Sequence, residues 1–206
     1  KDKPYQNFIN ENEQKLNIGI SDDFGILACA PDVRESINHA EKILLEMGHN
    51  VERVYPDLSD SENTFQTLRA HMLATDKREL YVKYKDILKE DLRLNIEKGF
   101  NLTEKQISKA NIARGQIIKN TNSFFQNYDF LIAPSSMVSP FNINKHWPKK
   151  VEDKTFDNYV SWLMTAATIS LTGCPSLAVP CSNTNDSLPI GIQIIGKRRN
   201  EGKVLN

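Results

Sequence analysis

Two adjacent serines, Ser135 and Ser136, are the first residues in this sequence that suggest nucleophilic catalysis. They follow the apolar segment DFLIAP at 129–134. A serine hydroxyl is a weak nucleophile near neutral pH, so it needs an adjacent base and preorganised donors for the developing oxyanion. No glycine-rich loop surrounds the pair to supply such donors. The bare pair therefore gives little support to a nucleophile at this position.

Cysteine and histidine offer a second kind of nucleophile, in which a thiolate pairs with an imidazole base. Cys174 and Cys181 are the candidates, but the four histidines are scattered, and no spacing places one beside either sulfur. The third cysteine, Cys29, leaves an odd number for disulfide pairing within the chain. We therefore expect reduced thiols that pack as small apolar side chains, as in cytosolic proteins.

Metal and phosphate sites have characteristic spacings that this sequence lacks. It contains no H-E-x-x-H or C-x-x-C motif and no G-x-G-x-x-G loop. Two carboxylate pairs, Asp22 with Asp23 and Glu152 with Asp153, are neighbours in sequence, so their side chains point in different directions on most backbones. We expect a solvated surface at both pairs, and neither a metal ion nor a cofactor.

The first quarter of the chain predicts a strand–helix–strand unit. LNIGIS at 16–21 alternates apolar and polar residues as a strand does. Pro31 and Asp32 open a helix, since proline suits the first turn and aspartate the positive end of the helix dipole, and Gly48 ends it. The predicted apolar face of this helix comprises Val33, Ile37, Ala40, Leu44 and Met47. A strand follows at 50–56, and so long a connection suits a right-handed parallel crossover.

Helices dominate the middle of the chain. Residues 60–98 are highly charged and mostly helical in pattern, and Thr103 with Gln106 forms a capping box before a long helix. The segment 129–134 is short and apolar, like a strand that is buried on both faces. The remaining predicted elements are a proline-punctuated loop at 134–148, a helix around 155–171, and strands near 176–180 and 190–195.

This order of elements predicts an α/β fold, in which helices cover both faces of a mixed sheet of about five strands. Residues 1–206 are expected to form a single domain, because the sequence has no internal repeat and no low-complexity linker. The polar residues 1–15 are expected to form an irregular or helical lead-in.

The last third of the chain carries short motifs in a specific order. From Tyr128 it reads YDFLIAPSSMVSPF, followed by Y-x-x-W from Tyr159, the L-T-G-x-P turn, the A-V-P-C strand end and L-P-x-G-x-Q-x-x-G. In this order and spacing the chain resembles the carboxy-terminal half of the amidase signature family, serine hydrolases that cleave carboxamide C–N bonds. The amino-terminal region matches more loosely, so the resemblance covers nearly the whole chain.

The resemblance implies a Ser–cis-Ser–Lys triad, in which a lysine acts through a bridging serine to activate the nucleophile. In the family these groups belong to an earlier Gly/Ser-rich segment, and no position of this sequence matches it. We therefore assign no catalytic residue. The chain taken alone is expected to be inactive, because the nucleophile and the oxyanion donors are both missing.

The resemblance also implies that this half supplies one wall of the acyl pocket. The substrate-binding residues expected from it are Ser136, Met137, Phe141, Trp162 and Ser170. For Met137 and Trp162, packing against the missing half is an equal alternative, because methionine and aromatic side chains bury large adaptable areas in either role. Trp147 is either a lid over the pocket or part of the core.

Three positions depart from the family pattern. Leu163 stands near the place where the tRNA amidotransferase subunit carries an aspartate that binds the substrate amino group, so a neutral or apolar pocket is expected rather than one for free glutamine. Ser182 and Ser187 replace glycines that are common in the family. If either backbone position needs a positive φ, a serine there is strained.

Charge and composition limit the classes of partner. Lys+Arg and Asp+Glu both number 26, so the formal net charge of zero removes the bulk attraction to nucleic acids and anionic membranes. No apolar run is long enough for a transmembrane helix. We expect a cytoplasmic protein with no nucleic-acid or membrane partner.

The leading hypothesis is the carboxy-terminal part of an amidase-type serine hydrolase that acts on a small-molecule amide. Its expected partners are the missing amino-terminal half and a second copy in a homodimer. The alternative is a non-catalytic binding or interaction module, or a subunit completed by a separate chain that bears the triad. An unrelated small-molecule-binding α/β domain would require the order of the motifs to be coincidence.

Overall fold

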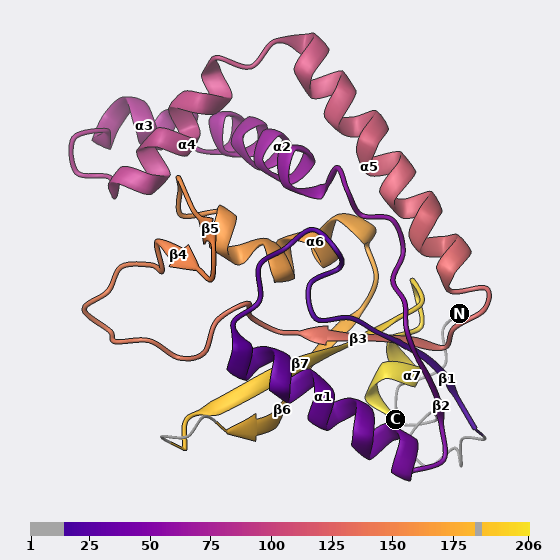
Figure 1. Ribbon diagram of the computed structural model, residues 1–206. Coiled ribbons are helices and arrows are strands. Elements are labelled where there is room, and N and C mark those ends of the chain that lie inside the picture. Colours follow the sequence, from indigo (N-terminus) through magenta and orange to yellow (C-terminus); the bar gives the residue numbers. More distant parts are fainter. Residues whose placement is uncertain (1–14, 184–186) are drawn as a thin grey trace.

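The computed structural model describes residues 15–183 and 187–206, so the lead-in predicted at 1–15 lies outside the described residues except for Lys15 (Figure 1). The strands are β1 (Asn17–Ile20), β2 (Asn50–Arg53), β3 (Phe130–Pro134), β4 (Lys150–Val151), β5 (Lys154–Thr155), β6 (Ser176–Asn183) and β7 (Pro189–Gly196). The helices are α1 (Pro31–Glu46), α2 (Ser61–Asp76), α3 (Arg78–Tyr84), α4 (Glu90–Phe100), α5 (Glu104–Phe124), the 3-10 turn η2 (Ser161–Leu163), α6 (Met164–Thr172) and α7 (Glu201–Leu205).

The main sheet has five strands in the order β2–β1–β3–β7–β6. β1 pairs in parallel with both β2 and β3, whereas β7 pairs antiparallel with both β3 and β6. The strands β4 and β5 form a separate short hairpin. The predicted α/β fold with a mixed sheet is therefore confirmed, and so is the parallel crossover from β1 through α1 to β2.

One face of the sheet is covered by α1 and α7. Their buried side chains pack with those of β1, β3 and β7 in one apolar cluster, which contains Ile18, Ile20, Ile37, Ala40, Phe130, Ile132, Ile192 and Val204. The predicted face of α1 is wrong at its end, because Met47 is 65% exposed. The helix ends at Glu46, Met47 is its cap, and Gly48 with a φ of +90° turns the chain directly after it, so Met47 lies outside the apolar face of the helix.

The opposite face is covered by α5 and α6, so helices lie on both sides of the sheet as predicted. The capping box of α5 is confirmed: the Gln106 amide donates to the Thr103 hydroxyl (3.3 Å), and the Thr103 amide donates to the Gln106 side chain (2.9 Å). Phe124 packs directly over β1, where a Cβ on Gly19 would lie 2.5 Å from its ring. The glycine therefore permits the close approach of α5 to the sheet.

The helix predicted around 155–171 begins only at Met164. Before it, the Asn158 side chain accepts hydrogen bonds from the amides of Val160 (2.9 Å) and Ser161 (3.2 Å). Such an asparagine turn competes with helix formation, so the chain enters η2 and α6 through a tight turn. At its other end α6 stops at Gly173, which has a φ of +69°.

A third apolar cluster lies under the β4–β5 hairpin and the loop that follows β3. It contains Met137, Trp147, Val151, Phe156, Val160, Met164 and Ala167. The cluster anchors the long loop 135–149 against α6, although this loop has no regular secondary structure of its own.

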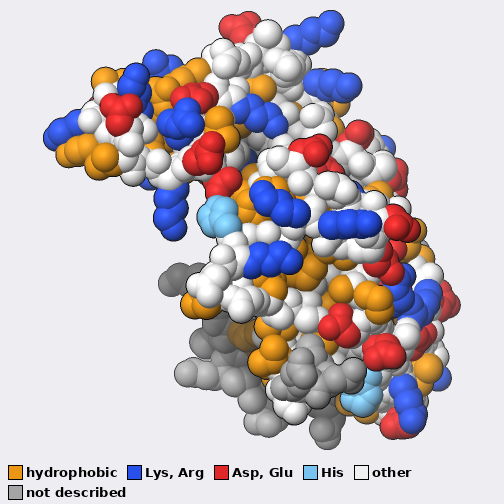
Figure 2. Space-filling view, turned by 60° about the vertical axis from the view of Figure 1, so that its left-hand side comes forward, with side chains coloured by type: hydrophobic (Ala, Val, Ile, Leu, Met, Phe, Trp, Pro, Cys, Tyr) orange, Lys and Arg blue, Asp and Glu red, His pale blue; other side chains and the backbone are white. Residues whose placement is uncertain are grey.

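The face seen in Figure 2 shows no separation of charge. Figure 2 shows hydrophobic, basic and acidic side chains interspersed over one face, with the helical end projecting from the body. Within the described residues, none of the helices is both long and apolar enough to cross a membrane.

Candidate functional site

The candidate site lies at the edge of the sheet where the parallel strands β1 and β3 end. Ligands of α/β folds commonly bind outside the carboxyl ends of parallel strands. The two loops that leave this edge are joined by backbone hydrogen bonds, from Ser21 to the Ile132 carbonyl (3.0 Å) and from Ala30 to the Met137 carbonyl (2.9 Å). The antiparallel strand β7 begins at the same edge, beside the end of β3.

A cavity of about 250 Å³ opens at this edge. Three separate segments line it: the loop after β3, the turn η2 and the start of β7. Its lining residues are Ser135, Ser136, Val138, Ser139, Pro140, Phe141, Trp162, Pro189, Ile190 and Gly191.

The serine hydroxyls of this cavity point to acceptors of the protein itself. Ser135 donates to the Gly191 carbonyl (2.9 Å), Ser136 donates to the Val138 carbonyl (2.9 Å), and Ser139 donates to the Asp32 carboxylate. Within the described part of the chain, no histidine or lysine makes a hydrogen bond to Ser135 or Ser136. The geometry therefore does not support an activated serine at this pair.

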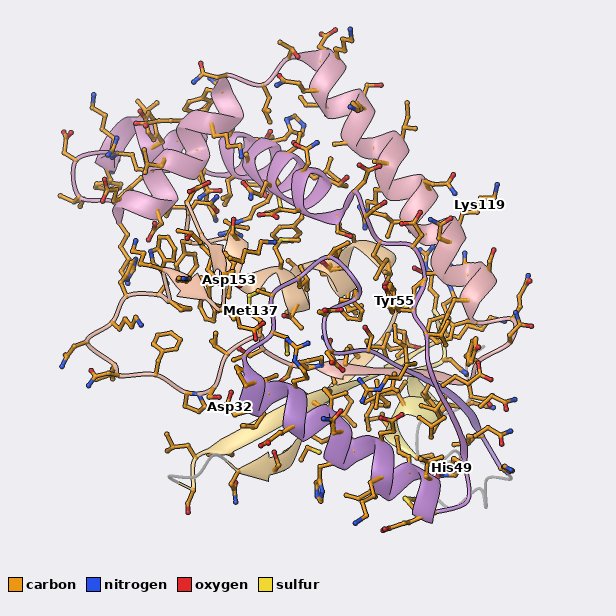
Figure 3. The ribbon with its side chains drawn as sticks, in the orientation of Figure 1. Asp32, His49, Tyr55, Lys119, Met137 and Asp153 are labelled. Atoms are coloured by element: carbon orange, nitrogen blue, oxygen red, sulfur yellow. The ribbon has the colours of Figure 1, made fainter. Side chains whose placement is uncertain are left out.

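Three of the five predicted substrate-binding residues meet in the cavity: Ser136, Phe141 and Trp162. The rings of Phe141 and Trp162 form an edge-to-face pair, with centroids 5.7 Å apart at 83°. The other two residues do not line it. Met137 is 2% exposed and belongs to the third apolar cluster, and Figure 3 shows it in the interior above the start of α1. Ser170 is exposed on α6, and its hydroxyl donates to the Ala167 carbonyl (2.7 Å).

Trp147 is part of the core, because it is only 6% exposed within the same cluster as Met137. The ammonium group of Lys149 lies over its ring, 3.3 Å from the ring centroid. A cation over an indole face is an attractive contact. Of the two alternatives for Trp147, a lid or a part of the core, the structure supports the core.

Gln193 is a residue of the site that the sequence analysis did not single out. It is 5% exposed, and its amide nitrogen donates to the Pro134 carbonyl (2.8 Å) while its amide oxygen accepts from the Ser176 hydroxyl (2.9 Å). A weaker contact joins it to the Thr165 carbonyl (3.4 Å). One side chain thus connects β3, β6 and α6. The glutamine of L-P-x-G-x-Q was the available signal, but its partners are distant in sequence.

Gly191, two residues before Gln193, also helps to position the loop after β3. A Cβ at this position would lie 2.7 Å from the Ser135 hydroxyl and 3.3 Å from the Val179 carbonyl. The absence of a side chain lets the loop after β3 lie directly against β7. Together, Gly191 and Gln193 fix the point where the cavity loop leaves the sheet.

Trp162 is positioned from α2. The hydroxyl of the preceding residue, Ser161, donates to the Glu62 carboxylate (2.8 Å), and the Gln66 side chain donates to the same oxygen (3.2 Å). Tyr159 supports the indole from the other side, with ring centroids 6.0 Å apart. The indole nitrogen of Trp162 is itself buried and has no acceptor among the described residues.

The thiols show no sign of activation. Burial raises the pKa of Cys29 from its ordinary 9.0 to about 12, and burial also raises the pKa of Cys174. Both thiols therefore stay protonated near neutral pH, which makes them poor nucleophiles. The described residues also contain no group of three or more His, Cys, Asp or Glu side chains that could hold a metal ion.

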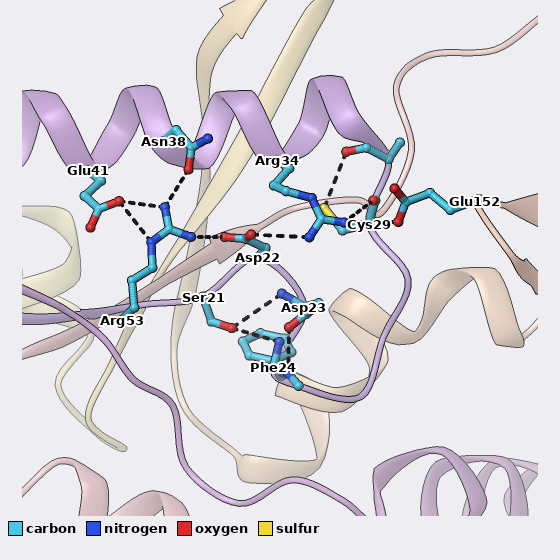
Figure 4. Close-up of polar contacts among 12 residues, drawn as sticks. Ser21, Asp22, Asp23, Phe24, Cys29, Arg34, Asn38, Glu41, Arg53 and Glu152 are labelled. Atoms are coloured by element: carbon cyan, nitrogen blue, oxygen red, sulfur yellow. Dashed lines mark hydrogen bonds and ion pairs between the residues drawn. The ribbon is translucent and has the colours of Figure 1, made fainter.

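A network of ion pairs stabilises the loop after β1, which lies beside the site (Figure 4). The carboxylate of Asp22 pairs with Arg53 (2.6 Å) and Arg34 (3.7 Å), and Arg34 also donates to the Cys29 carbonyl (3.0 Å) and to Glu152 (3.1 Å). The expectation of a solvated carboxylate is wrong for Asp22, whose side chain is only 14% exposed. The network joins β2, α1 and the β4–β5 turn to this loop.

One of the two serine departures is strained. Ser187 has a φ of +62°, in the left-handed region that favours glycine, whereas Ser182 is not among the described residues with positive φ. The strain expected from replacing the family's glycine therefore applies to Ser187.

Comparison with known proteins decides the family. The model of the Amidase family matches residues 1–205. The chain belongs to the Amidase family. The resemblance to the amidase signature family inferred from the motifs is therefore confirmed.

Curated relatives cover the chain but extend well beyond it. A putative amidase AmiC of Mycobacterium leprae is 24% identical over 208 residues, which are 98% of this chain and 44% of that protein. A subunit of the glutamyl-tRNA(Gln) amidotransferase of Brevibacillus brevis is 25% identical over 226 residues, 98% of this chain and 45% of that protein. The chain thus spans less than half the length of these relatives.

Solved structures share the fold. A bacterial aryl acylamidase of the amidase signature family superposes with a TM-score of 0.85 at 20% identity, covering 98% of this chain and 44% of that one. A 6-aminohexanoate cyclic dimer hydrolase complexed with substrate gives a TM-score of 0.80 at 18% identity, covering 99% and 46%. This likeness concerns the fold of the chain.

Proposed function

We propose that this chain is the carboxy-terminal part of an amidase-type serine hydrolase that cleaves carboxamide C–N bonds. The observation that carries the proposal is the match of the Amidase family over residues 1–205. The cavity beyond the carboxyl ends of β1 and β3 supports it, because it lies where an α/β fold commonly binds its ligand.

In the complete enzyme, a serine outside this chain would attack the amide carbonyl and release ammonia or an amine. Water would then hydrolyse the acyl-serine, so that two easier steps replace one difficult step. The chain would contribute sheet strands and one wall of the acyl pocket, built from Ser136, Phe141 and Trp162. Taken alone it would be inactive, since Ser135 and Ser136 have neither a histidine nor a lysine as a hydrogen-bond partner among the described residues, and burial raises the pKa of the Cys29 and Cys174 thiols.

The proposed substrate is a neutral amide rather than free glutamine. Among the described residues, no charged side chain lines the cavity. Leu163, near the position where the amidotransferase subunit carries its aspartate, offers no charge for a substrate amino group either. Burying an unpaired charge in such a lining would be costly.

A second candidate is a component of a larger enzyme that a separate triad-bearing chain completes. The relative from Brevibacillus brevis is one subunit of an amidotransferase, which favours this two-chain arrangement. A non-catalytic binding module is the outcome if no such chain exists. The three arrangements differ in what accompanies this chain.

The test is the size and reactivity of the natural gene product in its own cells. We expect an antibody against this region to detect, on a denaturing gel, a band far larger than 23.5 kDa that a serine-directed fluorophosphonate labels. A band of 23.5 kDa together with a labelled second chain would support the two-chain arrangement. A band of this size without any labelled partner would contradict the enzyme proposal.

A further inference from the structure

The hydrogen-bond donors of the cavity are already used. Each of its three serine hydroxyls, on Ser135, Ser136 and Ser139, donates to a carbonyl or carboxylate of the protein. A hydroxyl has a single proton to donate. The lining therefore keeps only hydroxyl lone pairs as free side-chain groups, besides the buried indole N–H of Trp162.

The charge behind the cavity is negative. The carboxylate of Asp32 sits next to Ser139, and it also accepts a hydrogen bond from the Val33 amide (2.9 Å). Within the part of the chain that the structure describes, no lysine, arginine or histidine lines the cavity. An anionic ligand would find neither a cation nor a free hydroxyl donor in this lining. It would also be repelled by the carboxylate of Asp32, which lies directly behind Ser139.

The remaining lining is apolar and aromatic. Val138, Pro140, Pro189 and Ile190 surround the edge-to-face pair of Phe141 and Trp162. The ring of Phe141 is 38% exposed, so part of it is free to contact a ligand. Aromatic rings favour such edge-to-face contacts beyond the burial of their area.

The size of the cavity limits the group that fits. Its volume of about 250 Å³ lies below the range of about 300–1,000 Å³ that is usual for complete drug-sized ligands. It exceeds the roughly 150 Å³ of an apolar cavity that accepts benzene. A single ring with a small substituent is the size that fits the part of the pocket lined by the described residues of this chain.

We propose that this cavity selects a neutral, compact aryl group of benzoyl size on the substrate amide, and that Phe141 and Trp162 determine this selectivity. This inference rests on the proposed function, because only a hydrolase would use the amide as its substrate. Binding of the aryl group, however, does not depend on hydrolysis. A binding experiment therefore tests it separately from the enzyme assay.

The two tryptophans of the chain allow a direct test by NMR. Each gives one indole N–H signal in a ¹H–¹⁵N spectrum of the 206-residue chain, and a Trp147→Phe variant identifies the signal of Trp162. Benzamide is the probe, and 4-carbamoylbenzoate is its charged counterpart. We expect benzamide to shift the Trp162 signal saturably while the Trp147 signal stays in place, because Trp147 does not line this cavity.

The charged probe should bind at least about tenfold more weakly, because its carboxylate would be buried without a partner. The Phe141→Ala variant should weaken benzamide binding by about two- to tenfold through the loss of the aromatic contact. Phe100→Ala is a matched control: Phe100 is 37% exposed and forms an edge-to-face pair with Tyr81 at 5.3 Å, far from the cavity lining.

Four results would overturn the proposal. They are no saturable shift of the Trp162 signal, an equal shift of the Trp147 signal, equal affinity for both probes, and unchanged affinity in Phe141→Ala. If benzamide binds as expected but the natural gene product hydrolyses no amide, the aryl site stands and the proposed hydrolase activity fails.

Discussion

At the scale of single residues, Gln193 stabilises the site through hydrogen bonds although its side chain is almost fully buried. In a Gln193→Leu variant, the buried Pro134 carbonyl and the Ser176 hydroxyl lose their partners while the shape changes little. An unsatisfied buried group costs about 1–3 kcal/mol, and of the two only the Pro134 carbonyl is buried, because Ser176 is exposed and its hydroxyl can bond to water, so we expect the free energy of unfolding to fall by about 1–3 kcal/mol. Urea denaturation followed by circular dichroism measures this change.

Gln116→Leu is the control for that variant. Gln116 lies exposed on α5, and its side chain donates only to Asn120 (2.7 Å). Substitutions of this kind usually stay within about 0.5 kcal/mol. Equal losses in the two variants would show that Gln193 does not act as a buried connector.

Residue types alone could indicate the cavity loop but not the direction of each side chain. Ser136, Phe141 and Trp162 line the cavity, whereas Met137, next to Ser136, points into the core. The loop follows neither a helical nor a strand period, so no sequence pattern distinguishes the two directions. Gln193 was missed for a related reason, since its partners lie 17 to 59 residues away.

At the scale of elements, two helical glycines should respond to alanine in opposite ways. Gly99 is buried where α4 crosses α2, and a Cβ there would collide with the Ala70 carbonyl and lie 2.6 Å from the Ala74 Cβ. Gly115 on α5 has nothing within 4 Å of the same atom. The first substitution forces the helices apart, and the second only gains helix propensity.

We expect Gly99→Ala to lower the free energy of unfolding by about 1–3 kcal/mol through overpacking. Gly115→Ala should raise it by about 0.5–1 kcal/mol. Thermal or urea unfolding of both variants beside the parent chain gives the two signs. A gain in both would mean that α2 and α4 are not in close contact at Gly99.

Local sequence signals predicted the bounds of those helices that begin or end at a recognisable capping residue. The capping box at Thr103 gave the start of α5, and Gly48 gave the end of α1. The start of α6 was misplaced because the turn at Asn158 overrides the apolar pattern around it. The hairpin of β4 and β5 has two residues in each strand, which is too short for a period to appear.

At the scale of the whole molecule, the fold class followed from the order of elements, because parallel and antiparallel connections need different lengths. The strand order of the sheet did not follow, since β7 inserts between β3 and β6, and only long-range pairing decides this. The triad that the proposed function requires matches no position of this sequence, so neither kind of reasoning places it.

The two edges of the sheet differ, and this difference predicts how the chain alone behaves in solution. At one edge β2 carries the exposed charges of Glu52 and Arg53, which protect an edge from pairing. At the other edge β6 is longer, has only β7 as a neighbour within the described sheet, and exposes Ala178, while Pro180 and the bulge after it restrict open pairing to the first half of the strand. Open apolar strand edges promote pairing with another chain.

We therefore expect the purified 206-residue chain to self-associate through β6, and Ala178→Lys to shift it towards the monomer by placing a charge on that strand. Sedimentation velocity over a series of concentrations measures the shift. Ala166→Lys, at an exposed alanine on α6, is the control and should leave the association unchanged. A chain that is monomeric at every concentration, or an equal effect of both lysines, would show that β6 is not the associating edge. Self-association that only the lysine on β6 reverses would identify this strand as the associating edge.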